Sequence, residues 1–163
     1  MRKLRFVVDG NLIPLARKMR VIGVDVAVFS TNSPHEMLLF CRKEQRILLT
    51  KSRTFAKFFK KYDQSFFLIE KEEGILGKVI EYFGIKPSHP RCPFCNVELS
   101  PVCHEEIKGR VPIYVLLSAE KFALCRKCGR VFWKGSHLKW LEEVVKDEVG
   151  RIEENRRNRN CEK

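Results

Sequence analysis

The sequence has 163 residues, 44% of them apolar, with a formal net charge of +12 and an isoelectric point near 9.6. That length suffices for one medium domain or for a small domain with an appended module, and the apolar content excludes a chain that is disordered throughout. The excess of positive charge favours polyanionic partners, of which nucleic acid is the most common.

Short apolar runs alternate with amphipathic stretches along the first half of the chain. Strands are predicted at residues 4–8, 24–29, 46–50 and 66–69. Helices are predicted after them, at residues 12–23, 33–44, 53–62 and 75–83. This alternation predicts a parallel α/β sheet with helices on both faces.

The composition changes at Lys86-Pro-Ser-His-Pro90, which predicts a domain boundary. We expect four parts: an α/β domain at 1–86, a zinc ribbon at 91–137, a helix at 138–154, and a basic, disordered tail at 155–163.

Two CxxC pairs predict a metal site in the second part. Cys92-Pro-Phe-Cys95 and Cys125-Arg-Lys-Cys128 are separated by 29 residues, which leaves room for a hairpin arm over Arg110 to Leu117. Four thiolates form a closed tetrahedral shell, so the pattern favours a structural zinc ion. Redox dithiols and an iron–sulfur cluster are the alternatives.

The cysteine count also bears on the compartment. Seven cysteines, an odd number, with clear metal spacing favour a reducing cytosol over a disulfide framework. No apolar run approaches the roughly 18 residues of a membrane span, and no signal peptide opens the sequence. We therefore expect a cytoplasmic protein without a membrane partner.

Asp9 follows the first predicted strand, at the edge where open α/β sheets place functional groups. With Glu36, which begins the second helix, it is a candidate catalytic residue holding Mg2+ or Mn2+. The alternatives are structural: Asp9 caps a helix, and Glu36 is the capping-box partner of Ser33. The third strand ends in Thr50-Lys51-Ser52, without an acid.

Basic residues on two helices are candidates for RNA binding. Arg53, Lys57, Lys60 and Lys61 share one side of the third predicted helix, which is rich in phenylalanine, and we expect them to meet the ends of the first and third strands. A solvated helix face is the alternative. The remaining candidates are Arg17, Lys18, Arg20 and Lys51.

Six stretches of the sequence carry a resemblance to a known family: Phe6-Val-Val-Asp9, Leu15-Ala-Arg-Lys-Met-Arg20, Arg46-Ile-Leu-Leu-Thr50, Arg91-Cys-Pro-Phe-Cys-Asn96, Gly109-Arg-Val-Pro112 and Cys125-Arg-Lys-Cys-Gly-Arg-Val-Phe-Trp-Lys-Gly-Ser-His137. Together they resemble the Mut-seven C-terminal RNase family over residues 4–140. The resemblance implies a PIN-like, three-layer α/β/α domain, a C-terminal four-cysteine zinc ribbon and a terminal helix. It also implies RNA cleavage by a water activated by Mg2+ or Mn2+ held between clustered acids.

The sequence departs from the family pattern at the acids. Asp9 matches the first one, but Ser52 stands where the family has an aspartate after the third strand, and Lys51 beside it would repel a cation. We therefore expect a protein that binds RNA, or a ribonucleoprotein such as the ribosome, with weak or absent cleavage. An active endoribonuclease using Asp9 and Glu36 is the first alternative, and a protein-interaction adaptor is the second.

Overall fold

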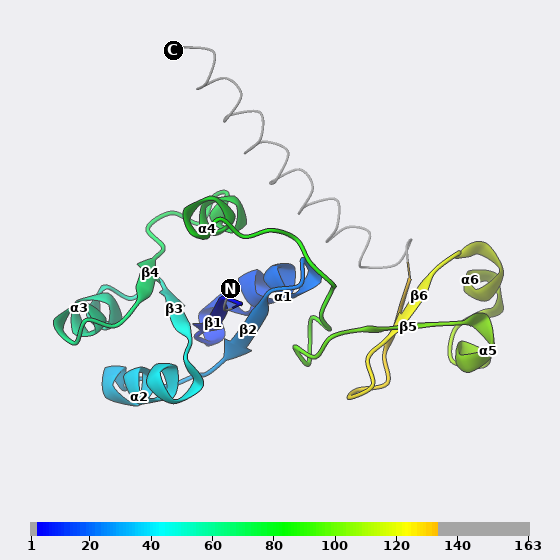
Figure 1. Ribbon diagram of the computed structural model, residues 1–163, viewed down its shortest axis with the longest axis horizontal. Coiled ribbons are helices and arrows are strands. Elements are labelled where there is room, and N and C mark those ends of the chain that lie inside the picture. Colours follow the sequence, from blue (N-terminus) through cyan, green and yellow to red (C-terminus); the bar gives the residue numbers. More distant parts are fainter. Residues whose placement is uncertain (1–2, 134–163) are drawn as a thin grey trace, which may run out of the picture.

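The computed structural model describes residues 3–133. The predicted helix at 138–154 and the tail at 155–163 lie outside the described residues. A four-stranded parallel sheet, in the order β2-β1-β3-β4, forms the centre of the first half (Figure 1). Its strands are β1 (Arg5–Val8), β2 (Asp25–Val28), β3 (Ile47–Thr50) and β4 (Phe66–Leu68).

Because the four strands are parallel, the residues that follow them gather along one edge, here called the carboxyl edge. Val8 at the end of β1 is in register with Val28 of β2 and Leu49 of β3. Asp9 therefore lies at this edge beside the central strand, followed by a short 3-10 helix, η1 (Gly10–Leu12).

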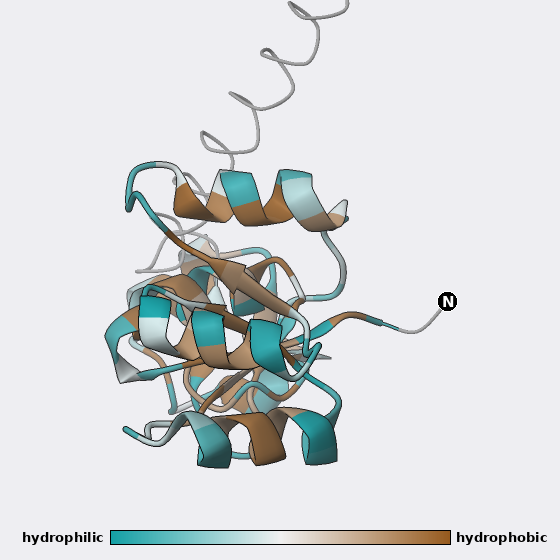
Figure 2. Ribbon diagram, turned by 90° about the vertical axis from the view of Figure 1, so that its left-hand side faces the viewer, coloured by the Kyte–Doolittle hydropathy of each residue, from teal (hydrophilic) through white to brown (hydrophobic). Residues whose placement is uncertain are grey.

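Helices cover both faces of the sheet, as predicted. Alternate residues of a strand point to opposite faces, so Phe6 and Val8 pack in one apolar cluster and Val7 in another. The first cluster includes residues of α1 (Ile13–Val21) and α4 (Ile75–Phe83), and the second includes residues of α2 (Pro34–Glu44) and α3 (Arg53–Lys61). Figure 2 shows the apolar residues concentrated between the helices and the sheet.

Local signals set the ends of these helices. The Ser33 side chain accepts a hydrogen bond from the Glu36 amide, 3.3 Å, and Ser52 caps α3 in the same way. Gly84, with φ 61°, ends α4 in the left-handed conformation that glycine adopts without strain. The predicted capping box forms only in half, because the Ser33 amide donates to the Thr31 hydroxyl instead of the Glu36 carboxylate.

The last third of the described chain, residues 91–133, is called the zinc module below. Its antiparallel sheet has the order β5-β6-β7, and two short helices lie between the CxxC pairs. The elements are β5 (Ser100–Val102), α5 (His104–Ile107), α6 (Ile113–Ser118), β6 (Phe122–Leu124) and β7 (Val131–Trp133).

The predicted hairpin arm over Arg110 to Leu117 is wrong. Most of that stretch lies in α6 instead of a strand, and the buried apolar residues of α5, α6 and their flanks pack together. Together with Phe122 they form a small core of their own: Ile107, Val111, Val115 and Ala119.

The proline-containing boundary packs closely on the end of α1. The Ser88 amide donates to the Ile22 carbonyl, 2.9 Å, and the Arg91 amide to the Arg20 carbonyl, 2.9 Å. Gly23 lies beneath this crossing with φ 91°, and a Cβ there would lie 2.7 Å from the His89 carbonyl oxygen. The chain therefore enters the zinc module in contact with the α/β sheet.

Candidate functional site

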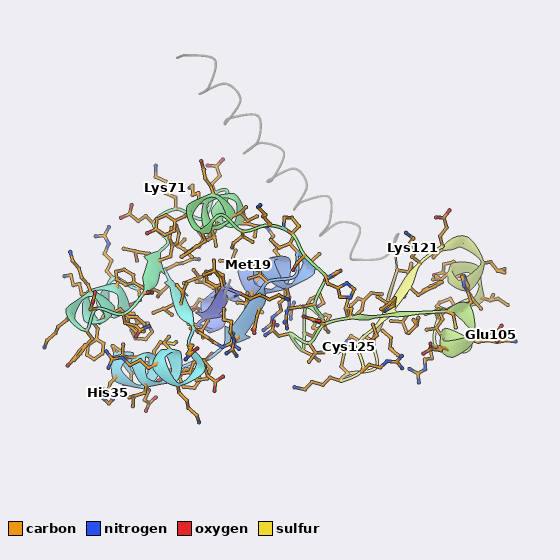
Figure 3. All side chains as sticks on the ribbon, in the orientation of Figure 1. Met19, His35, Lys71, Glu105, Lys121 and Cys125 are labelled. Carbon is orange, nitrogen blue, oxygen red and sulfur yellow. The ribbon has the colours of Figure 1, made fainter. Side chains whose placement is uncertain are left out.

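The four predicted metal ligands converge in the zinc module. The sulfurs of Cys92, Cys95, Cys125 and Cys128 all lie within 4.8 Å of one another, and those of Cys92 and Cys128 are 3.8 Å apart. A tetrahedral zinc ion with Zn–S bonds of about 2.3 Å separates its sulfurs by about 3.8 Å. The donor set therefore fits zinc, and a shell of four thiolates leaves no position for substrate. Cys125 lies near the meeting point of the α/β sheet domain and the zinc module (Figure 3).

Each CxxC turn ends on a residue with left-handed backbone. Asn96 follows the first pair with φ 63°, and Gly129 follows the second with φ 73°. The Asn96 amide donates to the Cys92 carbonyl, 2.9 Å, and the Gly129 amide to the Cys125 carbonyl, 2.8 Å. Glycine and asparagine tolerate this conformation best, so the sequence supports the same tight turn in both pairs.

The thiols differ in how readily they ionise. Burial raises the pKa of Cys92 to about 12. Burial also acts to raise the pKa of Cys128, but hydrogen bonds from the backbone and side chain of Arg130, with those of Cys125 and Cys95, outweigh it and lower that pKa to about 6. Zinc binding requires thiolates and so displaces protons.

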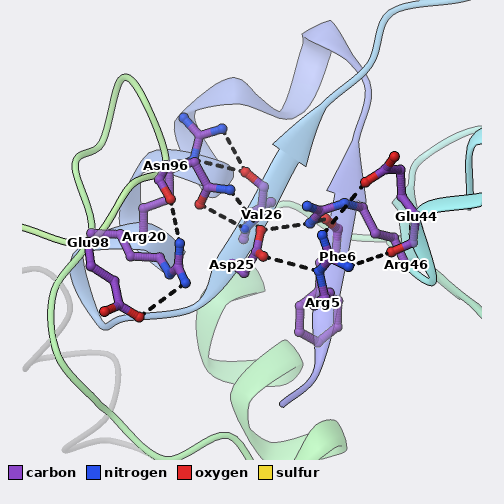
Figure 4. A network of polar contacts seen from close by, with 10 residues as sticks. Arg5, Phe6, Arg20, Asp25, Val26, Glu44, Arg46, Asn96 and Glu98 are labelled. Carbon is purple, nitrogen blue, oxygen red and sulfur yellow. Dashed lines mark hydrogen bonds and ion pairs between the residues drawn. The ribbon is translucent and has the colours of Figure 1, made fainter. Parts of the chain in front are cut away.

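Arg20 joins the first CxxC turn to the sheet. Its Nε and Nη2 donate to the Val26 carbonyl, 2.9 and 2.6 Å, and its Nη1 to the Pro93 carbonyl, 2.6 Å (Figure 4). The residue is only 6% exposed, and burial lowers the pKa of its guanidinium. Arg20 is therefore a structural residue, and because all three nitrogens of its guanidinium bond buried carbonyls, it does not belong to the exposed basic surface.

Asn96 makes the second connection between the zinc module and the sheet. Its side-chain oxygen accepts from the Val26 amide, 3.1 Å, and its nitrogen donates to Asp25 Oδ1, 2.7 Å. Because β2 is an edge strand, its outward-facing backbone groups would otherwise be open to another strand. Arg20 and Asn96 together bond both backbone groups of Val26.

Asp25 is the centre of this polar network (Figure 4). Its carboxylate accepts from Arg46 Nη1, 2.7 Å, from Asn96, and from Arg5 Nε, 3.2 Å. Burial acts to raise the pKa of Asp25, but hydrogen bonds from Arg46 and Asn96, with the charges of Arg46 and Arg91, outweigh it and hold that pKa below its usual value. We call the contacts among Arg5, Arg20, Asp25, Arg46 and Asn96 the junction network.

Sequence reasoning missed Asp25. The available signal was an acid inside the otherwise apolar run from Val24 to Phe29. A charge in such a run needs a buried partner, but the sequence does not say which of the many cations provides it.

At the carboxyl edge, a hollow of about 530 Å³ lies over the ends of β1, β2 and β3. Among the described residues that line it, Asp9 is the only acid, and its Oδ1 accepts from the Asn11 amide, 2.9 Å. The structural alternative for Asp9, a cap for the helix that follows, is therefore observed. The other polar lining residues are hydroxyls and amides: Asn11, Ser30, Thr31, Asn32, Ser52 and Thr54.

No acidic cluster accompanies Asp9 among the described residues. Within residues 3–133 the four cysteines are the only group of three or more His, Cys, Asp or Glu side chains close enough to hold one ion. Glu36 accepts a hydrogen bond from Thr31, which lines the hollow, and Lys51 forms an ion pair with Glu72. Ser52 lines the hollow and caps α3.

The basic candidates lie on different surfaces. Arg53, Lys57, Lys60 and Lys61 are exposed along α3. Because α3 begins at the carboxyl edge and runs away from it, only its first turn is at the predicted position. Lys60 and Lys61 lie toward the opposite edge, since nine helical residues span about 13 Å. On α1, Arg17 is exposed and Lys18 is partly buried.

These observations define a class of protein: a parallel α/β domain whose edge strand is joined to a tetracysteine zinc-ribbon module. A sequence model described as the Mut7-C RNAse domain matches residues 4–145, and the chain belongs to this family. The predicted resemblance is thereby confirmed. No curated protein and no solved structure matches the chain. Along residues 3–133, no helix has the length and apolarity to cross a bilayer.

Proposed function

We propose that this member of an RNase family binds RNA through the exposed basic face of α3, and that it cleaves RNA weakly or not at all. Family membership supports a nuclease-like, RNA-related function. The observation that carries the second part is the single acid among the described residues lining the hollow at the carboxyl edge.

The electrostatics of the hollow support weak binding of a divalent cation. Mg2+ and Mn2+ prefer carboxylate oxygens, and each acid replaced by a hydroxyl removes one negative charge from the site. Asp9 already accepts a backbone hydrogen bond, and the hydroxyl of Ser52 accepts another from Phe55. A cation at Asp9 would thus meet one charge and several neutral oxygens.

The cations on α3 support the RNA-binding part. None of Arg53, Lys57, Lys60 and Lys61 forms an ion pair with an acid of the described chain. Their charge is therefore available to phosphates, and binding should weaken as salt rises because counterions are released on association. Lys51 contributes less, since Glu72 pairs with it.

The test combines cleavage and binding on the full chain. RNA from a mixed pool is incubated with Mg2+ or Mn2+, with Asp9→Asn as the control, and binding is measured at low and high salt. We expect salt-sensitive binding that Lys57→Glu with Lys60→Glu weakens, and little cleavage. Efficient cleavage that Asp9→Asn abolishes would contradict the proposed loss of activity.

The same experiment decides the first alternative, an active metal-dependent endoribonuclease that uses Asp9 and Glu36. Its support is position: Asp9 faces the hollow, and Glu36 is bonded to Thr31, which also lines it. A protein-interaction adaptor is the second alternative. Its support is the exposed apolar surface of α6, where Ile113, Tyr114 and Leu117 are 70 to 81% exposed.

A further inference from the structure

An exposed aromatic ring lies where α1 meets both CxxC turns. Phe94, inside the first turn, is 49% exposed. The guanidinium of Arg17 on α1 lies 4.9 Å from the centre of this ring, and that of Arg130, just after the second turn, lies 4.4 Å from it. Three segments distant in sequence therefore meet at one ring that remains open to solvent.

Positive charge exceeds negative charge around this ring. Two neighbouring arginines are paired with glutamates, Arg91 with Glu98 and Arg126 with Glu106. On α1 and the two CxxC turns, the exposed cations without a carboxylate partner among the described residues are Arg17, Lys127 and Arg130.

The zinc ligands take up part of that charge. Zinc with four thiolates carries about −2. Arg130 bonds the Cys128 sulfur, which raises the pKa of the Arg130 guanidinium. The thiolates therefore offset part of the Arg130 charge, whereas Arg17 on α1 has no such neighbour among the zinc ligands and keeps its charge for a ligand.

We propose that Phe94, Arg17 and Arg130, here called the knuckle site, form a contact site for single-stranded RNA. An unpaired base can stack on an aromatic ring or on a guanidinium plane, and the same guanidiniums can bond phosphate oxygens. An acidic peptide would use the cations but would gain less from the ring. The inference rests on the proposed RNA binding and adds a second surface to it.

In Figure 1, α3 and the edge strand β2 lie on opposite sides of the sheet, and the knuckle site is on the side of β2. The first CxxC turn is bonded to β2, the strand at one side of the order β2-β1-β3-β4, whereas α3 packs near β3 and β4. We expect a short RNA to contact either the knuckle site or the basic face of α3, and a long RNA to contact both at once. Two linked contacts bind more tightly than either alone, so the knuckle site should matter most for long RNA.

The test measures fluorescence anisotropy of labelled oligouridylates on the zinc-loaded full chain, with lengths of about 4 and about 20 nucleotides. Phe94→Ala should weaken binding of the long RNA about tenfold, as loss of one base–aromatic stack does. Arg17→Gln with Arg130→Gln should reduce the slope of log affinity against log salt by about 0.7 to 1.4, since each lost phosphate contact contributes about 0.7 and the thiolates offset part of the Arg130 charge.

Matched variants separate this effect from folding and from general charge. Tyr114→Ala and Arg110→Gln remove an exposed ring and an exposed cation elsewhere in the zinc module, and should leave binding unchanged. Phe94→Tyr keeps the ring and should bind as the wild type, whereas Phe94→Leu keeps apolar bulk and should not. Zinc content is measured for each variant, and the comparison of Phe94→Tyr with Phe94→Leu applies if Phe94→Ala loses the metal.

The outcomes distinguish the two proposals. If the knuckle variants bind long RNA as the wild type does, while Lys57→Glu with Lys60→Glu binds it weakly, the knuckle site is overturned and the proposed function is kept. If the wild-type chain binds no RNA at low salt, both fail. If Tyr114→Ala weakens binding as much as Phe94→Ala does, the ring has no specific role and the knuckle site is also overturned.

Discussion

The junction network and the carboxyl edge of the sheet differ in whether their acid is paired with cations. In the junction network, Asp25 accepts hydrogen bonds from two arginines and an asparagine, and every contact ties one segment of the chain to another. At the carboxyl edge, the Asp9 side chain faces neutral hydroxyls and amides, and within the described residues it accepts one hydrogen bond, from the amide two residues ahead. The junction network thus connects the zinc module to the sheet. It does not lie at the edge where a nuclease of this family would hold its metal.

Removal of zinc should destabilise the protein more than any of the substitutions described below. Cys125→Ser, or a chelator, should abolish zinc binding and hydrogen-exchange protection of β6 and β7, because the core around the cysteines is small. Structural zinc contributes about 10–16 kcal/mol of binding free energy to the folding of small zinc peptides. Cys103→Ser, which alters an exposed cysteine outside the cluster, is the control. Protection that survives zinc loss would show that the zinc module is held by other contacts.

Asp25→Ala should destabilise the fold by about 2–4 kcal/mol, less than the loss of zinc does. It leaves Arg46, only 7% exposed, without its carboxylate. Urea unfolding measures the loss of stability. Glu70→Ala, at an exposed acid, should change stability by less than about 0.5 kcal/mol. Equal effects of the two substitutions would refute the special role of the junction network.

The lowered pKa of Asp25 also predicts a pH dependence. Because the folded-state pKa lies below the unfolded value of about 3.9, its stabilising contribution is present above that pH and is lost as the pH falls through the folded-state pKa. The difference in unfolding free energy between wild type and Asp25→Asn should therefore shrink between about pH 6 and strong acid. A difference that does not vary with pH would argue against an ionised Asp25.

Asn96→Gly tests the second connection with a smaller expected effect, about 1–2 kcal/mol. Glycine keeps the left-handed backbone at φ 63° and removes only the side chain that bonds Asp25 and Val26. Thermal unfolding followed with zinc bound gives the change. Gly129→Ala, which strains the corresponding turn without touching the junction network, separates the cost of backbone strain from that of lost hydrogen bonds.

Ser52→Asp, at the carboxyl edge, should change stability least but should alter metal binding. Aspartate caps a helix about as well as serine does, so stability should change by less than about 0.5 kcal/mol. The added carboxylate faces the hollow with Asp9 and should strengthen Mn2+ binding, measured by titration calorimetry. Ser52→Asn keeps the cap without the charge and should not. Equal Mn2+ binding by the two variants would mean that the missing acid is not what limits the site.

The sequence by itself determined the features that depend on near neighbours. Apolar spacing predicted the four strands and four helices of the α/β domain. Ser33 and Gly84 indicated helix ends, and the two CxxC pairs predicted a cluster of four thiolates. Asp9 was placed correctly because the end of a parallel strand defines its edge. Each of these signals acts over a few residues, where backbone geometry and side-chain period leave little choice.

Only the tertiary structure decided how distant charges are shared. Asp25 and Asn96 are 71 residues apart, and neither local sequence predicts that the two side chains will meet. Arg20 looked like one more surface cation on α1, but the first CxxC turn covers it and Pro93 accepts its hydrogen bond. A buried charge is stable only beside the partners that the fold brings to it, so its role depends on contacts that no local pattern records.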